Sequence, residues 1–556
     1  MARPWQRHYD YGVPTTVRYP RIPVHELVNI PANSHAAKPA VVYMGTKLSY
    51  WDLRNEIVRF ANALSGMGIK KGDRVGLHLP NCPQYIIAYY GALSIGAIVV
   101  NMNPLYTPSE LLHIVDNTGL TTLVTADVSI EAVRALCQQI DIPRVIVTSV
   151  YDYAGGQRQE KPTNLDMEEG WLHFLDIIIG STDTRRPKVD VTAADPALIQ
   201  FTGGTTGIPK GAILTHGNIV SAAFQSSLWG DPITGRTAYA RRSVFCALPF
   251  FHIYGNIVAM NWAMLNCATQ VLVPRFNIDE VMMLISIFDN ITFFPFVPTM
   301  LTAIVNHPKA EELELSRRFA LFNSGGAPMP LDLIDRVKEM GFFYNEGWGM
   351  TESTSLGFAT PVLGLKKAGS IGVPFPDTDV RVVDIEEGIE DVDIGEPGEL
   401  IVKSPLVMQG YWNDDEKTAD QIRDGWLYTG DIVVRDEDDY FHIVDRKKDM
   451  IIAGGYNIYP REIDEVLYQH PKIKAAVSVG VPHKYRGETV KAFVVLKDGQ
   501  KATKAEIIAF CREKLAPYKS PKLVEFRDSL PQSSIGKVLR KVLREEEIAK
   551  QKQDRP

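Results

Sequence analysis

Cysteine is scarce in this chain, with five residues among 556. They are Cys82, Cys137, Cys246, Cys267 and Cys511. Their number is odd and their spacing matches no metal-binding motif, so the sequence indicates neither a disulfide framework nor a zinc site. A reducing compartment is the simplest interpretation, and we expect the protein in the cytoplasm.

The chain also has no excess of positive charge and no long apolar run. With 59 basic and 66 acidic residues the net charge is −7, which argues against nucleic acid as the main partner. The N-terminus lacks a basic region followed by an apolar core, so we expect no signal peptide. Residues 85–100 are apolar but too few for a membrane span. We interpret them as a buried helix leading into a buried strand, and expect at most a peripheral membrane contact.

The length of 556 residues predicts about two to four domains. Helical periodicity in residues 50–67 and 83–94 alternates with short β-rich runs, which predicts βαβ units and parallel sheet. The β-rich runs are residues 75–79, 98–100, 122–125 and 144–148. After about Ser370, short β-like runs between Gly, Asp and Pro predict a small β subdomain. The charged tail from Glu545 onward is expected to fray.

The most informative segment is Gln200-Phe-Thr-Gly-Gly-Thr-Thr-Gly-Ile-Pro-Lys-Gly211, which lies between two short apolar runs. This arrangement predicts a strand, a tight loop and a second strand. Glycines let the backbone approach a ligand and form an anion nest, while Thr hydroxyls and Lys210 add donors and positive charge. The loop therefore predicts a polyphosphate site. It is not a G-x-x-x-x-G-K-[ST] loop, because no Ser or Thr follows Lys210. The alternative is a glycine-rich hairpin without a ligand.

A second glycine-rich string, Asn345-Glu-Gly-Trp-Gly-Met-Thr-Glu352, ends in a hydroxyl and a carboxylate. A nucleoside triphosphate needs Mg²⁺, and Mg²⁺ prefers one or two carboxylates together with phosphate oxygens. Glu352 suits that role, with Thr351 contacting phosphate. From these residues alone, a helix N-terminus with a Thr cap is an equal alternative.

Four further features are ordinary when taken singly. The Ser324–Pro328 string reads as a turn before a helix, and His252 in its aromatic run reads as a core residue. Asp431 reads as a solvated turn carboxylate, and Lys537 as a surface charge.

Taken together and in order, the motifs resemble those of the adenylate-forming enzymes, which include acyl-CoA synthetases, peptide-synthetase adenylation domains and luciferases. The resemblance extends from about Leu48 to Arg540. The Thr-Gly-Gly-Thr-Thr-Gly form of the loop looks most like fatty-acid CoA ligases, as do the strings beginning at Asn101, Leu214 and Tyr518.

The resemblance implies that ATP, and then AMP, is bound by the two glycine-rich strings and the Ser324–Pro328 turn. The residues are Thr202, Gly203, Gly204, Thr205, Thr206, Gly207, Gly325, Gly326, Ala327, Glu346, Gly347, Trp348, Gly349 and Thr351. Trp348 stands where the family has Tyr, and an aromatic side chain at this position can stack on adenine.

The resemblance also assigns roles to single residues. Asp431 matches the ribose-binding Asp, and Arg446 matches the Arg that contacts ribose or phosphate. His252 is expected to border the carboxylate site. Lys537 matches the catalytic lysine, although Ile535 stands where many members have Ser or Thr. Lys210 and a Mg²⁺ ion at Glu352 complete the expected catalytic set.

The implied fold is an α/β multidomain protein. Residues 1–445 are expected to form two α/β sheet subdomains and a small β-barrel-like subdomain. Residues 446–556 are expected to form a mobile small α+β domain with its hinge near Lys448. Rotation there would bring residues 452–457 to the active site, where Gly454 and Gly455 leave room for the pantetheine arm of coenzyme A.

These parts imply an AMP-forming carboxylate–CoA ligase. Aromatic and aliphatic residues around His252 and in Phe293–Pro298 favour a hydrophobic acid, and we expect a medium-to-long-chain fatty acid. Asn256 stands where some long-chain members place a gating Trp, so an alicyclic or aromatic acid is the alternative.

Two other functions compete with this one. An acyl-AMP ligase would pass the acyl group to an acceptor other than CoA, but no extra segment is visible between Glu352 and Arg446. A fatty-acid carrier without enzymatic activity would not need Lys210, Glu352, Asp431, Arg446 and Lys537 together. The direction of the reaction, including the ATP-forming direction, and a homodimer stay open.

Overall fold

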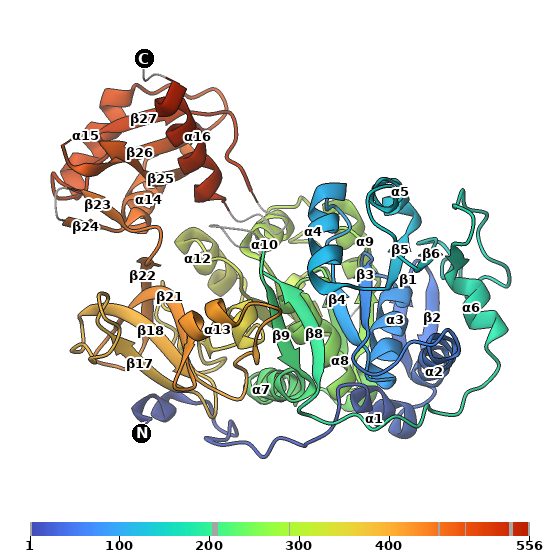
Figure 1. Cartoon of the computed structure of the whole chain (residues 1–556). Coiled ribbons are helices and arrows are strands. Elements are labelled where there is room, and N and C mark those ends of the chain that lie inside the picture. Colours follow the sequence, from blue (N-terminus) through green and yellow to red (C-terminus); the bar gives the residue numbers. More distant parts are fainter. Residues whose placement is uncertain are drawn as a thin grey trace. The chain divides into compact units, whose positions relative to one another are not determined.

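The structure is a computed structural model that describes residues 3–202, 209–288, 290–453, 456–483, 485–532 and 538–553. The chain divides into two compact units (Figure 1). Of the described residues, the first comprises those in 3–202, 209–379 and 403–427, and the second comprises those in 380–402 and 428–553. The α/β multidomain prediction is confirmed.

The larger sheet of the first unit has the order β16-β15-β14-β13-β12-β10-β11-β1-β2. Every neighbouring pair from β14 to β1 is parallel, whereas the outer strands are antiparallel. The strands are β1 (Pro39–Tyr43), β2 (Thr46–Ser49), β10 (Ser243–Cys246), β11 (Thr269–Leu272), β12 (Ile291–Phe296), β13 (Phe319–Ser324), β14 (Tyr344–Trp348), β15 (Phe358–Ala359) and β16 (Val373–Pro374).

The second sheet of this unit has the order β19-β9-β8-β4-β3-β5-β6-β7. Its strands from β8 to β7 are parallel, as the βαβ pattern predicts, and β9 and β19 extend it in antiparallel fashion. The strands are β3 (Arg74–His78), β4 (Ile98–Asn101), β5 (Thr122–Ala126), β6 (Arg144–Thr148), β7 (Leu172–His173), β8 (Pro196–Phe201), β9 (Gly211–Thr215) and β19 (Gly410–Tyr411).

Helices surround these sheets. The α-helices are α1 (Glu26–Ser34), α2 (Tyr50–Gly66), α3 (Pro83–Ser94), α4 (Pro108–Thr118), α5 (Ile130–Cys137), α6 (Phe174–Gly180), α7 (His216–Thr234), α8 (Trp262–Leu265), α9 (Ile278–Ile287), α10 (Pro298–Val305), α11 (Leu315–Arg318), α12 (Leu331–Glu339) and α13 (Asp415–Gln421). The 3-10 helices are η1 (Pro4–His8), η2 (Asp127–Ser129), η3 (Tyr239–Arg241) and η5 (Thr351–Ser353), and η4 (Gly255–Asn261) is a π-helix. Helix α3 begins with Pro83, whose fixed φ suits the first helical position. Its residues 83–93 are all buried, which confirms the predicted buried helix running into β4.

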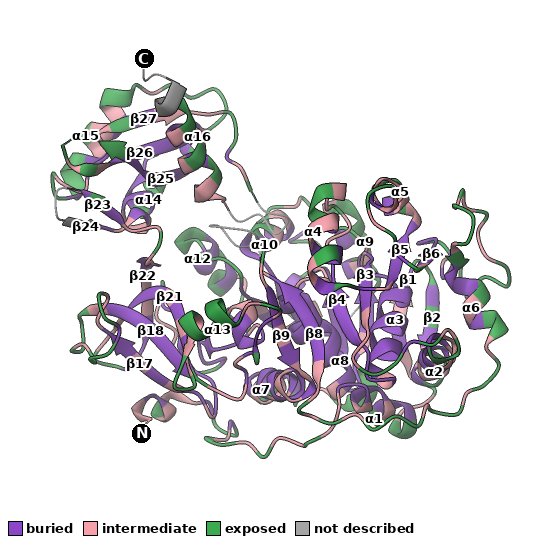
Figure 2. Ribbon diagram, in the orientation of Figure 1, coloured by how far each residue is buried: buried purple, intermediate pink, exposed green. Residues whose placement is uncertain are grey.

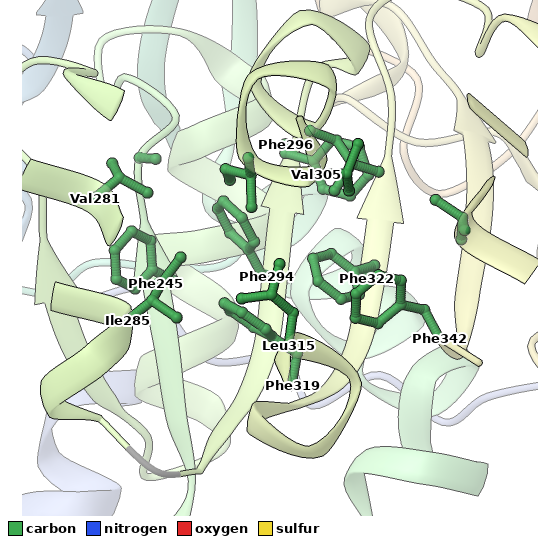
Figure 3. Packing of buried hydrophobic residues seen from close by; sticks show 14 of the residues in the cluster. Phe245, Val281, Ile285, Phe294, Phe296, Val305, Leu315, Phe319, Phe322 and Phe342 are labelled. Atoms are coloured by element: carbon green, nitrogen blue, oxygen red, sulfur yellow. The ribbon is translucent and has the colours of Figure 1, made fainter. Parts of the chain in front are cut away.

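A phenylalanine-rich core fixes the strands of the larger sheet (Figure 3). Every residue of β12 is buried, as is typical of a parallel strand covered on both faces. The Phe294 ring packs edge-on against Phe245, with 5.2 Å between centroids, and is stacked on Phe319 at 5.5 Å. Val281 and Ile285 of α9 belong to the same cluster. Burial is concentrated in the sheets, and exposed residues are common on the helices (Figure 2).

A small sheet lies mostly in the second unit and confirms the predicted β subdomain. Its order is β17-β18-β21-β20, and β22 also pairs with β21. The strands are β17 (Asp379–Val383), β18 (Pro397–Lys403), β20 (Ile422–Arg423), β21 (Trp426–Arg435) and β22 (Phe441–Arg446).

The C-terminal part of the second unit is an α+β domain. Its sheet has the order β24-β23-β26-β25, with β27 on β26. The elements are β23 (Ile451–Ala453), β24 (Tyr456–Ile458), α14 (Pro460–Tyr468), β25 (Ile473–His483), β26 (Gly487–Leu496), α15 (Lys504–Lys514), β27 (Leu523–Phe526) and α16 (Arg540–Gln553).

The prediction that the tail frays from Glu545 is wrong, because α16 continues through Gln553. Leu543 is fully buried in a hydrophobic cluster, and Glu547 forms an ion pair with Lys491 at 2.6 Å. Tertiary packing thus orders a charged segment. In the described part of the chain, no helix combines the length and apolarity needed to cross a bilayer.

Candidate functional site

Parallel strands bring three of the predicted site segments to one edge of the larger sheet. β10, β12, β13 and β14 are successive parallel neighbours, so their carboxyl ends lie on the same side. The loop containing His252 follows β10, Gly325–Ala327 follows β13, and Gly349–Glu352 follows β14. Ligands of open α/β sheets bind outside the carboxyl ends of the strands. The edge is therefore the natural position for a binding site.

Tyr254 joins these segments. Its hydroxyl donates to Asn323 Oδ1 at 2.7 Å, and Asn323 Nδ2 donates to Asn345 Oδ1 at 3.1 Å. A Cβ at Gly325 would lie 2.9 Å from the Tyr254 ring, so this position requires glycine. Sequence reasoning missed Tyr254 and Asn323, whose only signal is their closeness to predicted motifs.

His252 lies in a turn just before the π-helical segment η4. Its backbone N–H donates to Pro249 O at 3.2 Å, and its Nδ1 accepts from the Tyr254 N–H at 3.2 Å. Gln200, near the end of β8, donates to the carbonyl of Phe251 at 3.1 Å. This bond links the His252 turn to the strand that enters the glycine-rich loop.

The strand, loop and strand predicted around the glycine-rich string are confirmed by the antiparallel pair β8 and β9. The Thr202 N–H donates to Lys210 O at 2.9 Å and closes the base of the loop. The candidate residues Gly203, Gly204, Thr205, Thr206 and Gly207 lie outside the described residues.

Tyr411 lies between two of the predicted catalytic residues. The Lys210 ammonium lies 4.7 Å from the centroid of the Tyr411 ring, within cation–π range. The Tyr411 hydroxyl donates to Glu352 Oε1 at 2.8 Å. Burial, together with the Glu352 carboxylate, raises the pKa of Tyr411, so the phenol stays protonated and remains a donor. The fold thus brings Lys210 over the ring and Glu352 to the hydroxyl of one aromatic side chain.

Sequence reasoning missed Tyr411, although the aromatic pair that follows Gly410 is a signal. Tyr411 pairs with Ala212 of β9, and the Trp412 N–H donates to Gly211 O at 2.7 Å. The Met408 N–H donates to the carbonyl of Glu352 at 2.8 Å. Residues 408–412 therefore hold the backbones beside both catalytic candidates.

The string that ends at Glu352 follows a tightly packed path. A side chain at Gly349 would clash with the backbone of Ser355, which explains the glycine. Trp348 is buried and contacts Phe358 edge-on, with 5.4 Å between ring centroids. Burial raises the pKa of Glu346 to about 7. Adenine stacking on Trp348 stays a prediction.

Asp431 and Arg446 lie opposite each other on β21 and β22 of the second unit. Arg446 Nε is 2.9 Å from Asp431 Oδ1, and the Asp431 side chain is almost fully buried. Asp431 is thus a strand residue in an ion pair and not a solvated turn residue. Lys448 follows in the next turn, whereas Gly454, Gly455 and Lys537 lie outside the described residues.

Asn256 and Asn261 of η4 belong to a buried polar network. Asn256 Oδ1 accepts from the Tyr89 hydroxyl at 3.2 Å and from Asn261 Nδ2 at 2.9 Å. The Tyr90 hydroxyl donates to Asn261 Oδ1 at 2.9 Å. All four side chains are fully buried. Hydrogen bonds from the tyrosines of α3 thus satisfy the buried amide oxygens of the asparagines of η4.

Comparison with protein families gives two matches. Residues 29–412 match the family described as AMP-binding enzyme. Residues 462–537 match the family described as AMP-binding enzyme C-terminal domain.

Comparison with known proteins gives relatives over nearly the whole chain. A protein of Bacillus subtilis named long-chain-fatty-acid–CoA ligase is 38% identical over 98% of both chains. A feruloyl-CoA synthase of Amycolatopsis is 35% identical over 90% of this chain and 94% of its own. Among solved structures, ATP-bound MatB from Rhodopseudomonas palustris matches with a TM-score of 0.81 and 28% identity, over 94% of this chain and 99% of its own.

Proposed function

This chain belongs to the AMP-binding enzyme family, and we propose that it activates a medium-to-long-chain fatty acid. It is an AMP-forming carboxylate–CoA ligase that uses ATP, a carboxylic acid and coenzyme A. The observation that carries the choice of acid is the 38% identity over 98% of both chains to a long-chain-fatty-acid–CoA ligase.

In the first half-reaction, a carboxylate oxygen attacks the α-phosphorus of ATP, and the bond to pyrophosphate breaks. Negative charge spreads over the phosphate oxygens, and preorganised cations and N–H donors offset it. Lys210 and Lys537 supply the cations in this proposal. Residues 202–207, 325–327, 346–349 and Thr351 hold the nucleotide. Asp431 contacts its ribose, and Arg446 contacts its ribose or phosphate. His252 borders the acid.

Glu352 is the proposed protein ligand for Mg²⁺. Its Oε1 accepts from Tyr411, and a single carboxylate suits an ion that takes its remaining ligands from phosphate and water. Among the described residues, no group of three or more His, Cys, Asp and Glu side chains could hold a metal. The bound ion would neutralise charge on the phosphates.

In the second half-reaction, the thiol of coenzyme A attacks the acyl carbon, and the bond to AMP breaks. We propose that the C-terminal domain, residues 446–556, has its hinge at Lys448, and that the residues beyond the hinge rotate between the two steps and bring Gly454 and Gly455 beside the pantetheine arm. The contacts around Lys448 support this choice. Lys447 donates its N–H to Gly430 O at 2.8 Å and pairs with Glu399 at 2.8 Å, whereas Asp449 lies 3.9 Å from Arg540 of α16. Lys447 is thus tied to the small sheet and the Asp449 side chain lies near α16, while the Asp449 N–H, which donates to Arg446 O at 2.9 Å, makes a bond across Lys448 that rotation would break.

A panel of acids tests the proposed substrate. Each buried methylene contributes about 0.8 kcal/mol, so we expect kcat/KM to rise about fourfold per carbon until the pocket is filled. Hexanoate, hexadecanoate, benzoate and cyclohexanecarboxylate are compared by pyrophosphate release and by CoA thioester formation. A ring acid that exceeds every straight chain by about tenfold contradicts the fatty-acid proposal and leaves the ligase class intact.

An alicyclic or aromatic acid is the second candidate. The feruloyl-CoA synthase relative and the position of Asn256 favour it. A non-CoA acceptor and the ATP-forming direction are tested in the same assay, by omitting CoA and by supplying acyl-CoA, AMP and pyrophosphate. We also propose a cytoplasmic location, because the five cysteines form no disulfide, and leave open a homodimer and a peripheral membrane contact.

Replacing Glu352 by Gln should slow acyl-AMP formation about 100-fold, the loss typical of one charged transition-state contact. The variant should also need more Mg²⁺ for half-maximal rate. Tyr411→Phe is the matched control, since it removes the hydrogen bond to Glu352 but keeps the ring beside Lys210. We expect it to lose about tenfold at most. An E352Q enzyme with an unchanged Mg²⁺ dependence contradicts the metal role.

A further inference from the structure

Asp445 is a buried carboxylate near the end of β22, three residues before Lys448. Its side chain is 2% exposed. Oδ1 accepts from the Arg446 N–H at 2.7 Å, and Oδ2 accepts from the Arg461 N–H at 2.7 Å. The second bond is long-range, because Arg461 lies beyond Lys448 in α14.

This bond caps helix α14 from outside. The helix begins at Pro460, and the preceding Tyr459 makes no side-chain cap. The first N–H groups of a helix lack partners within it, and a carboxylate there also meets the positive end of the helix dipole. Asp445 of β22 therefore supplies to α14 the acceptor that the usual cap position does not.

A guanidinium holds the same region together. Arg540 is the first residue of α16. Its Nη2 lies 2.7 Å from Asp464 Oδ2 of α14, and its Nη1 lies 3.9 Å from Asp449 Oδ2. It also attracts the Asp445 carboxylate electrostatically. Asp464 in turn accepts from the Ser478 N–H at 2.6 Å. The arginine thus ties α14 and α16 to the turn after Lys448, while Asp445 ties α14 to the strand before it.

We propose that Asp445 is a positioning residue whose carboxylate latches α14 to β22, and that this latch opens in one of the two half-reactions. The inference rests on the proposed rotation about Lys448. If the C-terminal domain turns there, Arg461 moves relative to Asp445 and their hydrogen bond breaks. The latch then stabilises one arrangement of the domain over the other.

Hydrogen exchange at the Arg461 amide tests the latch without an activity assay. The wild-type protein is measured with ATP, and again with a non-hydrolysable hexadecanoyl-sulfamoyl adenosine plus CoA. We expect exchange rates that differ at least tenfold between the two states. Equal rates overturn the latch. Hexadecanoate-dependent ATP–pyrophosphate exchange by the same protein reports separately on the proposed function.

Single-turnover rates of the two half-reactions test the consequence. Asp445→Ala should change their ratio at least tenfold, and Asp445→Asn should change it less, because the amide oxygen still accepts. Asp384→Ala is the matched control. Asp384 also accepts from backbone N–H groups, those of Glu387, Gly388, Ile389 and Glu390, but within one local turn. We expect it to leave the ratio within twofold.

Proportional loss of both half-reactions in D445A and D445N overturns the proposal, because a purely structural role predicts that result. Circular dichroism melts identify a variant that does not fold. If D445A is unfolded, D445N and the Arg461 exchange measurement still decide the question.

Discussion

Lys537→Ala is expected to lose acyl-AMP formation by roughly two to three orders of magnitude. The proposed lysine contacts charge that develops in the transition state, and removal of one such contact costs about 2.7–4 kcal/mol. Lys537 lies outside the described residues, but the chain on both sides is fixed. Gln532 and Val538 form a β-bridge, and the Leu539 N–H donates to Pro531 O at 2.8 Å. ATP–pyrophosphate exchange with hexadecanoate measures the loss.

The second half-reaction is the internal control for this variant. We expect Lys537→Ala to convert supplied acyl-AMP and CoA at close to the wild-type rate, because in the proposed rotation that step uses the other face of the C-terminal domain. Lys541→Ala is the matched lysine variant. Lys541 lies on α16, where its Nζ is 3.6 Å from Glu545 Oε1 of the same helix. It should leave both steps unchanged. Equal loss of both half-reactions in K537A contradicts a dedicated adenylation role.

The parts of the fold that were predictable carry strong local patterns. Helix α3 was predicted from Pro83 to Ser94 and observed with those bounds, because Pro83 starts it and its apolar residues continue without a break. The strands beside the glycine-rich loop were equally clear, since short apolar runs flank a segment too rich in glycine to be regular. Local propensity and tertiary packing agree at these positions.

The parts that were missed depend on contacts between distant segments. Tyr411 lies 59 positions after Glu352 in the chain, and only the pairing of β19 with β9 brings it to the catalytic candidates. The buried network of the η4 asparagines was not predicted, because their tyrosine partners lie on α3 about 170 positions earlier. A single sequence does not reveal which buried polar side chains will form hydrogen bonds with one another.

The same limit applied to the acidic residues. Asp431 taken alone reads as a solvated carboxylate, and the sequence analysis assigned Asp445 no role. Their burial follows from the register of β21 and β22, in which Asp431 lies opposite Arg446 and Ile432 opposite Asp445. Electrostatic roles near the proposed hinge are therefore properties of the sheet and not of the motif.

Lys448→Pro is expected to separate the two half-reactions. Proline fixes φ near about −65° and removes the backbone N–H, so rotation about this bond is no longer available. Acyl-AMP should still form from ATP and hexadecanoate, whereas conversion of acyl-AMP and CoA to the thioester should fail. Single-turnover measurements of each step, with acyl-AMP supplied for the second, test both expectations.

Lys448→Ala is the matched control for the hinge, because it removes the same side chain but leaves the backbone free to rotate. We expect it to retain both half-reactions within a few-fold. If K448P and K448A show the same overall rate of CoA ligation, the pivot lies elsewhere. Contacts on each side of Lys448 limit where the pivot can lie. Lys447 is bonded to Gly430 and Glu399, so a pivot before Lys448 would break these bonds. Asp449 lies near Arg540, so a pivot after it would separate these two residues. A change of φ at Lys448 keeps both of these interactions and breaks the turn bonds to Arg446 O from the N–H groups of Asp449 and Met450.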